Sequence, residues 1–343
     1  MGFGTKLAIF CRRLKSASLR RLNQNIQTIH QQTGKNRLYL LADMLWCTFR
    51  YGVGYLDYHV FGFAENRGAN RKTFMTMNHN VALARMVNDP AYYDLLNDKV
   101  KFLGRYVDFL GRAWLDLRRA TPEALAAFCR EHPVVFAKPA GDFGGRGVER
   151  LAPGPEADYA ALYHRLTENR QVLVEEAIVQ HPEMSRLCSE SVNTLRVVTL
   201  LRDGEANIVY ALLRMGSGQG HVDNISSGGL YTWVDPQGKL PYPAFCDKTG
   251  LYYHRHPATG TVFSQFTVPD FPAAVALCCK AALVEPKLGY VGWDVAITPN
   301  GPILVEGNNL PGYDMPQNAK FHPDGQGLLP VFQALLGRPI PRA

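Results

Sequence analysis

A short stretch near the C-terminal end, residues 292–309, most constrains how this chain can fold. Two apolar runs flank a Pro-Asn-Gly turn at residues 299–301, and each run carries an acid at its far end. This pattern predicts a β-hairpin, and a three-residue loop would set Asp294 directly opposite Glu306. Side chains alternate along a strand, so Asn308 shares the face of the two acids. The opposite face should then belong to the core and carry Trp293, Val295, Ile297, Ile303 and Val305.

Two carboxylates directly opposite each other repel, and a cation between them would remove the repulsion. The two acids and the amide of Asn308 are hard oxygen ligands of the kind that Mg²⁺ prefers. A hairpin whose acids merely face water is the alternative. A two-residue loop would place the acids diagonally but would keep them on one face.

Composition indicates an ordinary soluble protein with two or three subdomains, since 46% of its 343 residues are hydrophobic and 20% are charged. No apolar run approaches the roughly 20 residues that cross a bilayer. The seven cysteines include no CxxC pair, so we expect reduced thiols in the cytoplasm. The first 50 residues hold nine Lys or Arg and a single acid.

Apolar residues recur at helical spacing between Leu7 and Ile29, with arginines and Lys15 among them, which predicts a basic amphipathic helix. Such a helix either packs on the core with a solvated basic face or attaches to an anionic membrane surface or an acidic partner. No motif supports nucleic-acid binding. The aromatic-rich stretch 38–63 is either a buried helical pair or a shallow membrane contact.

The middle of the chain predicts mixed elements. Residues 134–176 have the order strand, loop, strand, helix, strand, and further strands are expected at 193–201, 206–215 and 230–235, followed by a helix at 270–285. Antiparallel hairpins dominate, which indicates an α+β architecture. We expect a helical N-terminal region at 1–95, linking helices at 96–133, a lid at 134–178 and a core at 179–337.

Lys138 ends an apolar strand and precedes a loop that contains Gly141, Gly144, Gly145 and Gly147. Glycines let backbone amides close around phosphate, and a lysine beside them supplies charge. Taken alone, the loop could equally be a flexible turn. No GxxxxGK[ST] motif occurs, and the letters Asp142-Phe143-Gly144 lack the HRD and APE motifs of a protein kinase.

In its order of motifs the chain resembles the ATP-grasp superfamily, and within it the sugar-transfer-associated ATP-grasp family. The resemblance covers about residues 51–335. It is carried by NDKVKF, FAKPAGDFGGRGV, VLVEEAIVQHP, SVNTLRVVTL, VDNISSGG, GWDVAI and LVEGNNLPG. It implies an ATP-grasp fold, in which ATP lies between a mobile lid and a core sheet.

The resemblance also implies roles. Phosphate contacts fall to Lys99, Lys138 and the loop glycines Gly144, Gly145 and Gly147, and adenine contacts fall to Glu175, Glu176 and the backbone through Ile178. The ribose would lie near His181 or Glu183. One or two Mg²⁺ ions, or Mn²⁺, would be held by Asp294, Glu306 and Asn308, and Arg196 would stabilise the transferred phosphoryl group.

Three further features are predicted from the residues themselves. Arg214 could hold an acyl phosphate or a substrate carboxylate, or it could have a surface role. Asn224, Ser226, Ser227, Gly228 and Gly229 could form a substrate loop. The His254-Arg255-His256 cluster is interpreted as a loop and not as a metal site.

The resemblance implies a ligase that activates a carboxylate as an acyl phosphate, releases ADP and transfers the acyl group to an amine or a thiol. The alternatives are a kinase on the same scaffold and a non-catalytic nucleotide-binding partner of a membrane glycan assembly. Surface-polysaccharide or secondary-metabolite chemistry is suggested only by the family's association. We expect the protein in the cytoplasm or at the inner face of the membrane.

Overall fold

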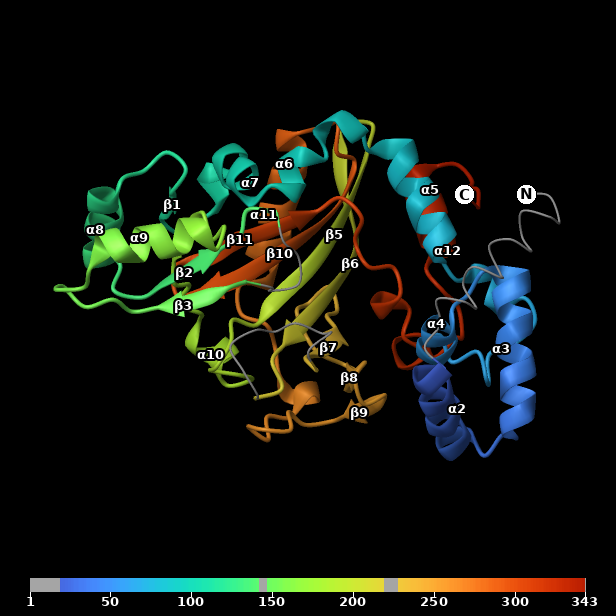
Figure 1. Ribbon diagram of the computed structural model, residues 1–343. Coiled ribbons are helices and arrows are strands. Elements are labelled where there is room, and N and C mark those ends of the chain that lie inside the picture. Colours follow the sequence, from blue (N-terminus) through green and yellow to red (C-terminus); the bar gives the residue numbers. More distant parts are fainter. Residues whose placement is uncertain (1–18, 142–146, 219–227, 343) are drawn as a thin grey trace. The chain divides into compact units, whose positions relative to one another are not determined.

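The computed structural model describes residues 19–141, 147–218 and 228–342 (Figure 1). The chain forms two compact units. One consists of Met1–Met86 with Leu310–Ala343, and the other of Val87–Asn309. The C-terminal segment therefore belongs with the N-terminal unit, whereas we expected the core domain to run to residue 337 and the N-terminal region to end at 95.

The first unit is helical in its described part. Its helices are α2 (Leu19–Thr33), α3 (Arg37–Tyr51), α4 (Tyr55–Val60), α5 (Met77–Val87) and α12 (Leu329–Leu336), with 3₁₀ turns at Asn70–Thr73, Met315–Gln317 and Ala319–Phe321. Asn36 caps the start of α3 and Gly52 ends it in the left-handed conformation. The helix expected over Leu7 to Ile29 is described only from Leu19, and it runs on to Thr33.

Aromatic side chains fill the core of this unit. Phe63 packs against the rings of Tyr58, Phe61 and Phe74. A buried ion pair joins Arg71 to Asp43, and the Tyr58 hydroxyl donates to the same carboxylate at 2.7 Å. Arg71 also donates to the backbone carbonyls of Phe63 and Asn66, so the ion pair connects α3 to the segment that follows α4.

The second unit contains a small antiparallel sheet with strands in the order β1-β4-β2-β3. The strands are β1 (Trp114–Asp116), β2 (Val135–Lys138), β3 (Glu149–Leu151) and β4 (Leu173–Glu176). Helices α8 (Pro122–Glu131) and α9 (Tyr159–Glu168) pack on one face, around a core that includes Leu125, Val135 and Val174. The sheet and its helices include most of the range 134–178 that was predicted as a lid, and β1 and α8 precede that range in sequence.

A seven-stranded antiparallel sheet forms the larger part of this unit, in the order β11-β10-β5-β6-β7-β8-β9. Its strands are β5 (Thr194–Arg202), β6 (Glu205–Met215), β7 (Leu230–Trp233), β8 (Ala244–Cys246), β9 (Leu251–Tyr253), β10 (Tyr290–Thr298) and β11 (Gly301–Asn308). Short helices α6 (Asp94–Asn97), α7 (Lys99–Arg105) and α10 (Pro182–Ser185) and 3₁₀ turns at Pro90–Tyr92, Val107–Phe109 and Phe263–Gln265 complete the unit. The predicted α+β architecture is confirmed.

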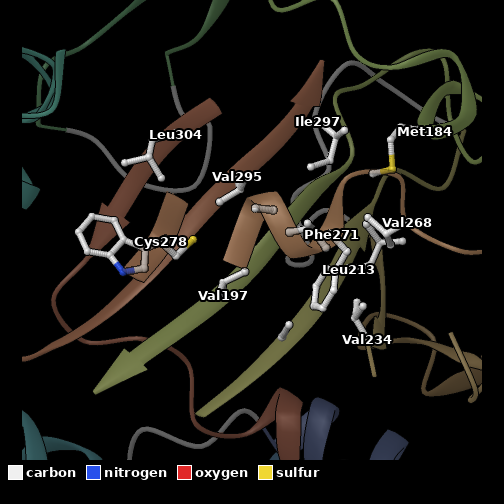
Figure 2. Packing of buried hydrophobic residues seen from close by; sticks show 14 of the residues in the cluster. Met184, Val197, Leu213, Val234, Val268, Phe271, Cys278, Val295, Ile297 and Leu304 are labelled. Carbon is white, nitrogen blue, oxygen red and sulfur yellow. The ribbon is translucent and has the colours of Figure 1, made fainter. Parts of the chain in front are cut away.

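Helix α11 (Phe271–Val284) packs across one face of this sheet (Figure 2). Cys278 of the helix lies among Val197, Val295 and Leu304, which come from three adjacent strands. Since side chains alternate along a strand, the residues between these apolar positions project from the other face. That second face carries the charged residues of the candidate site.

The acidic hairpin formed with a different register from the one expected. The loop has two residues, because Thr298 pairs with Gly301, and a bulge then falls between Asp294 and Val295 opposite β11. Val295 consequently pairs with Leu304, while Asp294 still pairs with Glu306. Of the expected core positions, Ile303 is buried but lies outside the core cluster that contains Cys278, and Val305 is only half-buried. Leu304 joins that cluster instead, since the two-residue loop shifts β11 by one residue up to the bulge.

No helix in the described ranges is long and apolar enough to cross a membrane.

Candidate active site

Four charged side chains stand on one face of four adjacent strands, β6, β5, β10 and β11. Arg196 lies directly opposite Asp294 across the β5–β10 ladder and binds it through Nε and Nη2, the latter at 2.9 Å. Nη1 of Arg214 reaches the same carboxylate at 2.9 Å. Glu306 pairs with Asp294 from the other side. The repulsion between the two acids is thus relieved by guanidinium groups of the protein itself.

The surroundings separate the two acids chemically. Burial would raise the pKa of Asp294, but the charges of Arg196 and Arg214 hold that pKa well below its ordinary value. Burial, together with the charge of Asp294, raises the pKa of Glu306 to about 7, although both arginines oppose the shift. Asp294 is therefore ionised throughout the neutral range, whereas Glu306 is present in both its protonated and its ionised form near pH 7.

The donors available to a metal ion are oxygen atoms. Within the described ranges no group of three or more His, Cys, Asp or Glu is placed to hold a metal ion. Asn308 stands beside Glu306, with its Nδ2 at 3.4 Å from Oε1, and pairs with Gly292 in the ladder. Glu306 and Asn308 fit the hard-oxygen donor set of Mg²⁺, whereas Asp294 presents oxygens that two arginines already occupy.

A second charged group lies on the small sheet, where Glu175 is buried between two cations. Its Oε2 is 2.6 Å from Nζ of Lys138, and its Oε1 is 2.6 Å from Nη2 of Arg112. Burial would raise the pKa of Glu175, but the charges of Lys138 and Arg112 lower it to about 2. The Lys138 side chain is about one-fifth exposed, whereas that of Glu175 is 4% exposed.

Arg112 connects this group to the acidic hairpin. Its side chain is 3% exposed, and its Nη1 donates to the carbonyl of Leu304 at 2.5 Å while Nη2 reaches that of Val305 at 3.3 Å. These carbonyls lie at the bulge that sets Glu306 opposite Asp294. The sequence analysis missed Arg112, which lies in a short segment between elements. The only local signal was an arginine immediately before an apolar pair.

Lys99 is brought to the start of the glycine loop. Its backbone N–H donates to the carbonyl of Ala140 at 2.9 Å, two residues beyond Lys138. The predicted phosphate-binding lysines therefore come from neighbouring segments. At the far end of the loop, Gly147 has a φ of +68°, and a Cβ there would lie 2.8 Å from Pro139 Cγ, so glycine is required. Gly144 and Gly145 lie outside the described residues.

The predicted adenine and ribose contacts follow β4. Glu176 is half-buried, and its Oε2 accepts a hydrogen bond from the Ala113 N–H at 3.0 Å. Ile178 is half-buried as well. His181 caps α10 with its ring, and its backbone N–H donates to the carbonyl of Ile297 on β10 at 2.7 Å. Glu183 is exposed and pairs with Arg186.

The predicted substrate segments are described only in part. Asn224, Ser226 and Ser227 lie outside the described residues, while Gly228 and Gly229 precede β7. In the His254–His256 cluster, His256 is buried and its Nε2 contacts the carbonyl of Gly216 at 2.7 Å. His256 therefore anchors the segment after β6, consistent with the loop interpretation.

Part of the chain matches a known protein family. Residues 158–335, just over half of the chain, match the model of the family described as "Sugar-transfer associated ATP-grasp". No curated protein matches the chain.

Solved structures with similar folds include three ligases or carboxylases. The ATP-grasp ligase PsnB in complex with a minimal precursor is 17% identical with a TM-score of 0.44, covering 73% of this chain and 63% of its own. D-alanyl-alanine synthetase A from Vibrio cholerae is 15% identical with a TM-score of 0.42, covering 70% and 64%. Biotin carboxylase from Campylobacter jejuni is 14% identical with a TM-score of 0.41, covering 64% and 41%. The chain thus spans less than two thirds of the length of each of them.

Proposed function

This chain belongs to the sugar-transfer associated ATP-grasp family, and from that premise we propose that it is an ATP- and Mg²⁺-dependent ligase for a carboxylic acid. The acid would be joined to an amine or, in the variant reaction, to a thiol. The observation that carries the proposal is the charged face of the large sheet, with Arg196, Arg214, Asp294 and Glu306 on adjacent strands and Arg112 linking it to Lys138 through Glu175.

The proposed reaction has two steps. A carboxylate oxygen of the acid attacks the γ-phosphorus of ATP, the bond to the bridging oxygen breaks, and ADP leaves with an acyl phosphate formed. The amine nitrogen then attacks the acyl carbon and loses a proton as the carbon–oxygen bond to phosphate breaks. The products are an amide, ADP and inorganic phosphate, and a thiol in place of the amine would give a thioester.

The chain's own residues supply positive charge and position in this scheme. Lys138 and Lys99, on neighbouring segments beside the glycine loop, would bind the phosphates of ATP, with Gly144, Gly145 and Gly147 closing over them. Glu175, Glu176 and the backbone through Ile178 would bound the adenine, and His181 or Glu183 the ribose. Phosphoryl transfer depends mainly on such positioning and charge neutralisation.

Glu306 and Asn308 would hold one or two Mg²⁺ or Mn²⁺ ions, and Asp294 would join them once Arg214 turns away from its carboxylate. A bound ion there would neutralise phosphate charge. Arg196, directly opposite Asp294, would face the transferred phosphoryl group. Arg214 reaches Asp294 from β6 and would be the group that turns to the carboxylate or acyl phosphate of the substrate.

Nucleotide binding and turnover test the assignment in sequence. MgATP binding is measured by titration calorimetry, and ADP formation is measured with a pool of carboxylic acids and amines. Glu306→Gln and Lys138→Ala should each abolish ADP formation. Arg202→Ala, on the same strand as Arg196 but in an exposed pair with Asp203, is the matched control and should leave turnover unchanged.

The results distinguish the ligase from the two alternative functions, a kinase and a non-catalytic nucleotide-binding partner. ADP formed only when acid and amine are both present supports the ligase. ADP with a phosphorylated product and no need for an amine indicates a kinase, and MgATP binding without turnover of any tested substrate indicates a non-catalytic partner. Retained turnover in Glu306→Gln would remove the site assignment.

The biological setting proposed here is synthesis or modification of a surface polysaccharide or secondary metabolite in the cytoplasm, with the protein peripheral at the inner face of the membrane. The basic N-terminal region, whose described part begins at Leu19, supports attachment to an acidic partner or surface.

A further inference from the structure

Helix α3 is apolar on both of its sides, although only one side packs on the protein. Leu40, Met44 and Cys47 are buried in the first unit. The opposite side carries Leu38, which is 77% exposed, and Trp46, which is 55% exposed, together with the exposed residues Tyr39, Ala42 and Leu45. A helix on the surface of a soluble protein normally has polar residues on its outer side.

The spacing makes these residues one continuous strip. Positions 38, 42, 45 and 46 recur at intervals of four, three and one, which places them on one side of an α-helix. Half-buried Leu41 lies at the edge of the same side, and half-buried Phe49 lies within it. We name Leu38, Tyr39, Ala42, Leu45 and Trp46 the outer strip; it contains no charged residue.

Basic residues surround the outer strip. Arg37 and Arg50 are exposed at the two ends of α3, and the guanidinium of Arg67 lies 5.3 Å from the centre of the Tyr39 ring. The one acid of the helix, Asp43, is neutralised in its pair with Arg71 and is 11% exposed. The rim of the strip is therefore positive without an opposing acid from the helix.

Charge is divided unequally between the two units of the chain. The segments Met1–Met86 and Leu310–Ala343 contain sixteen Lys or Arg against five Asp or Glu. The segment Val87–Asn309 contains 21 against 25. All of the protein's excess positive charge belongs to the unit that carries the outer strip. Self-association through this strip would bring two strongly positive units together, which like-charge repulsion opposes.

We propose that the outer strip of α3 is a membrane-binding surface that inserts into the interface of an anionic lipid bilayer. Trp and Tyr side chains favour the boundary between headgroups and acyl chains, and arginines at the rim attract acidic headgroups. A helix of 15 residues is about 22 Å long, which is too short to span a hydrocarbon core of about 30 Å. The helix would therefore lie in the plane of the interface, as amphipathic anchors do.

The first test is co-sedimentation of the full-length protein with vesicles. One set contains phosphatidylcholine alone, and the other contains phosphatidylcholine with roughly 30 mol% phosphatidylglycerol, which gives the vesicles an anionic surface. We expect the protein to bind the anionic vesicles at least tenfold better than the neutral ones, and to dissociate as salt is raised. Absence of binding to the anionic vesicles would overturn the proposal.

Variants locate the binding surface. Leu38→Glu and Trp46→Glu should each weaken vesicle binding by about tenfold or more, since each removes a large inserted side chain and adds a like charge to the acidic lipids. Leu283→Glu, on α11 of the other unit and 47% exposed, is the matched control and should bind as the wild type does. Unchanged circular dichroism and MgATP affinity would show that the variants are folded.

Two further outcomes would contradict the proposal. Binding that persists in the Leu38→Glu/Trp46→Glu double variant would assign attachment to another part of the chain. The outer strip would instead be an interface between two copies if the wild type formed a concentration-dependent dimer and did not bind vesicles, and if the double variant were monomeric. A positive result is independent of the ligase assignment, because vesicle binding requires no substrate.

Discussion

Replacing Arg112 by methionine should destabilise the second unit and weaken its nucleotide site together. The substitution keeps most of the side-chain volume but removes two hydrogen bonds to Glu175 and those to the carbonyls of Leu304 and Val305. Removing one partner of a buried pair costs about 3–5 kcal/mol. Lys138 still neutralises Glu175, so we expect about 3 kcal/mol, the lower end of that range.

The assay is urea denaturation followed by tryptophan fluorescence, because the buried Trp293 lies in the same unit. A double-mutant cycle with Glu175→Gln separates the pair from simple loss of packing. The Arg112→Met/Glu175→Gln variant should be more stable than the sum of the single losses predicts, since the buried carboxylate is removed together with Arg112 and the remaining cation, Lys138, is about one-fifth exposed.

The pH dependence gives a second measure of the same pair. The pKa of Glu175 falls from an ordinary 4.5 to about 2 in the folded protein, so the carboxylate favours folding above the unfolded pKa. This stabilisation is lost as the pH falls from about 4.5 to 2. The loss should be smaller in Arg112→Met. The coupling between Arg112 and Glu175 would be refuted if the stability losses of the two single variants were additive and the loss of stability at acidic pH were the same in Arg112→Met as in the wild type.

Two further predictions concern packing and protonation. Gly327→Ala should lower the free energy of unfolding of the first unit by at least about 2 kcal/mol, because the new Cβ would lie 2.5 Å from the Phe74 Cα. Gly104→Ala lies in α7 with open space around it and should raise the free energy of unfolding by up to about 1 kcal/mol. Equal effects of the two variants in thermal melts would contradict both predictions. Burial, with the charge of Arg342, lowers the pKa of His79 to about 4, so stability should fall as the pH drops from about 6.5 to 4. His79→Gln should make this slope shallower in urea midpoints measured across that range, and part of the slope should remain because burial also lowers the pKa of His59 to about 4.

The acidic hairpin shows which features sequence patterns can predict. The alternation of Trp293, Val295 and Ile297 placed β10 correctly, because a strand with one face in the core repeats every second residue. The register of β11 was not predictable, since nothing in the letters distinguishes a two-residue loop with a bulge from a three-residue loop without one. Asp294 pairs with Glu306 as expected, but a two-residue loop followed by a bulge produces this pairing, whereas we had expected a three-residue loop without a bulge.

The charged face was predicted in its members but not in its contacts. Motif order pointed to Arg196, Arg214 and Asp294 separately, but that both arginines bind one carboxylate depends on the pairing of β10 with β5 and of β5 with β6. Arg112 was missed because its partners are 63 and about 190 residues away. Single positions outside a periodic element leave no pattern, and only the tertiary structure reveals their partners.

We propose that the charged face activates a carboxylate as an acyl phosphate. Hydroxylamine traps an acyl phosphate as a hydroxamate and so detects this intermediate. The protein is incubated with MgATP, hydroxylamine and a pool of amino, sugar and other carboxylic acids, while ADP and hydroxamate are measured together. We expect equal amounts of ADP and hydroxamate from the wild type, and neither product from Glu306→Gln. ADP formed with a phosphorylated product and without hydroxamate would contradict the proposal.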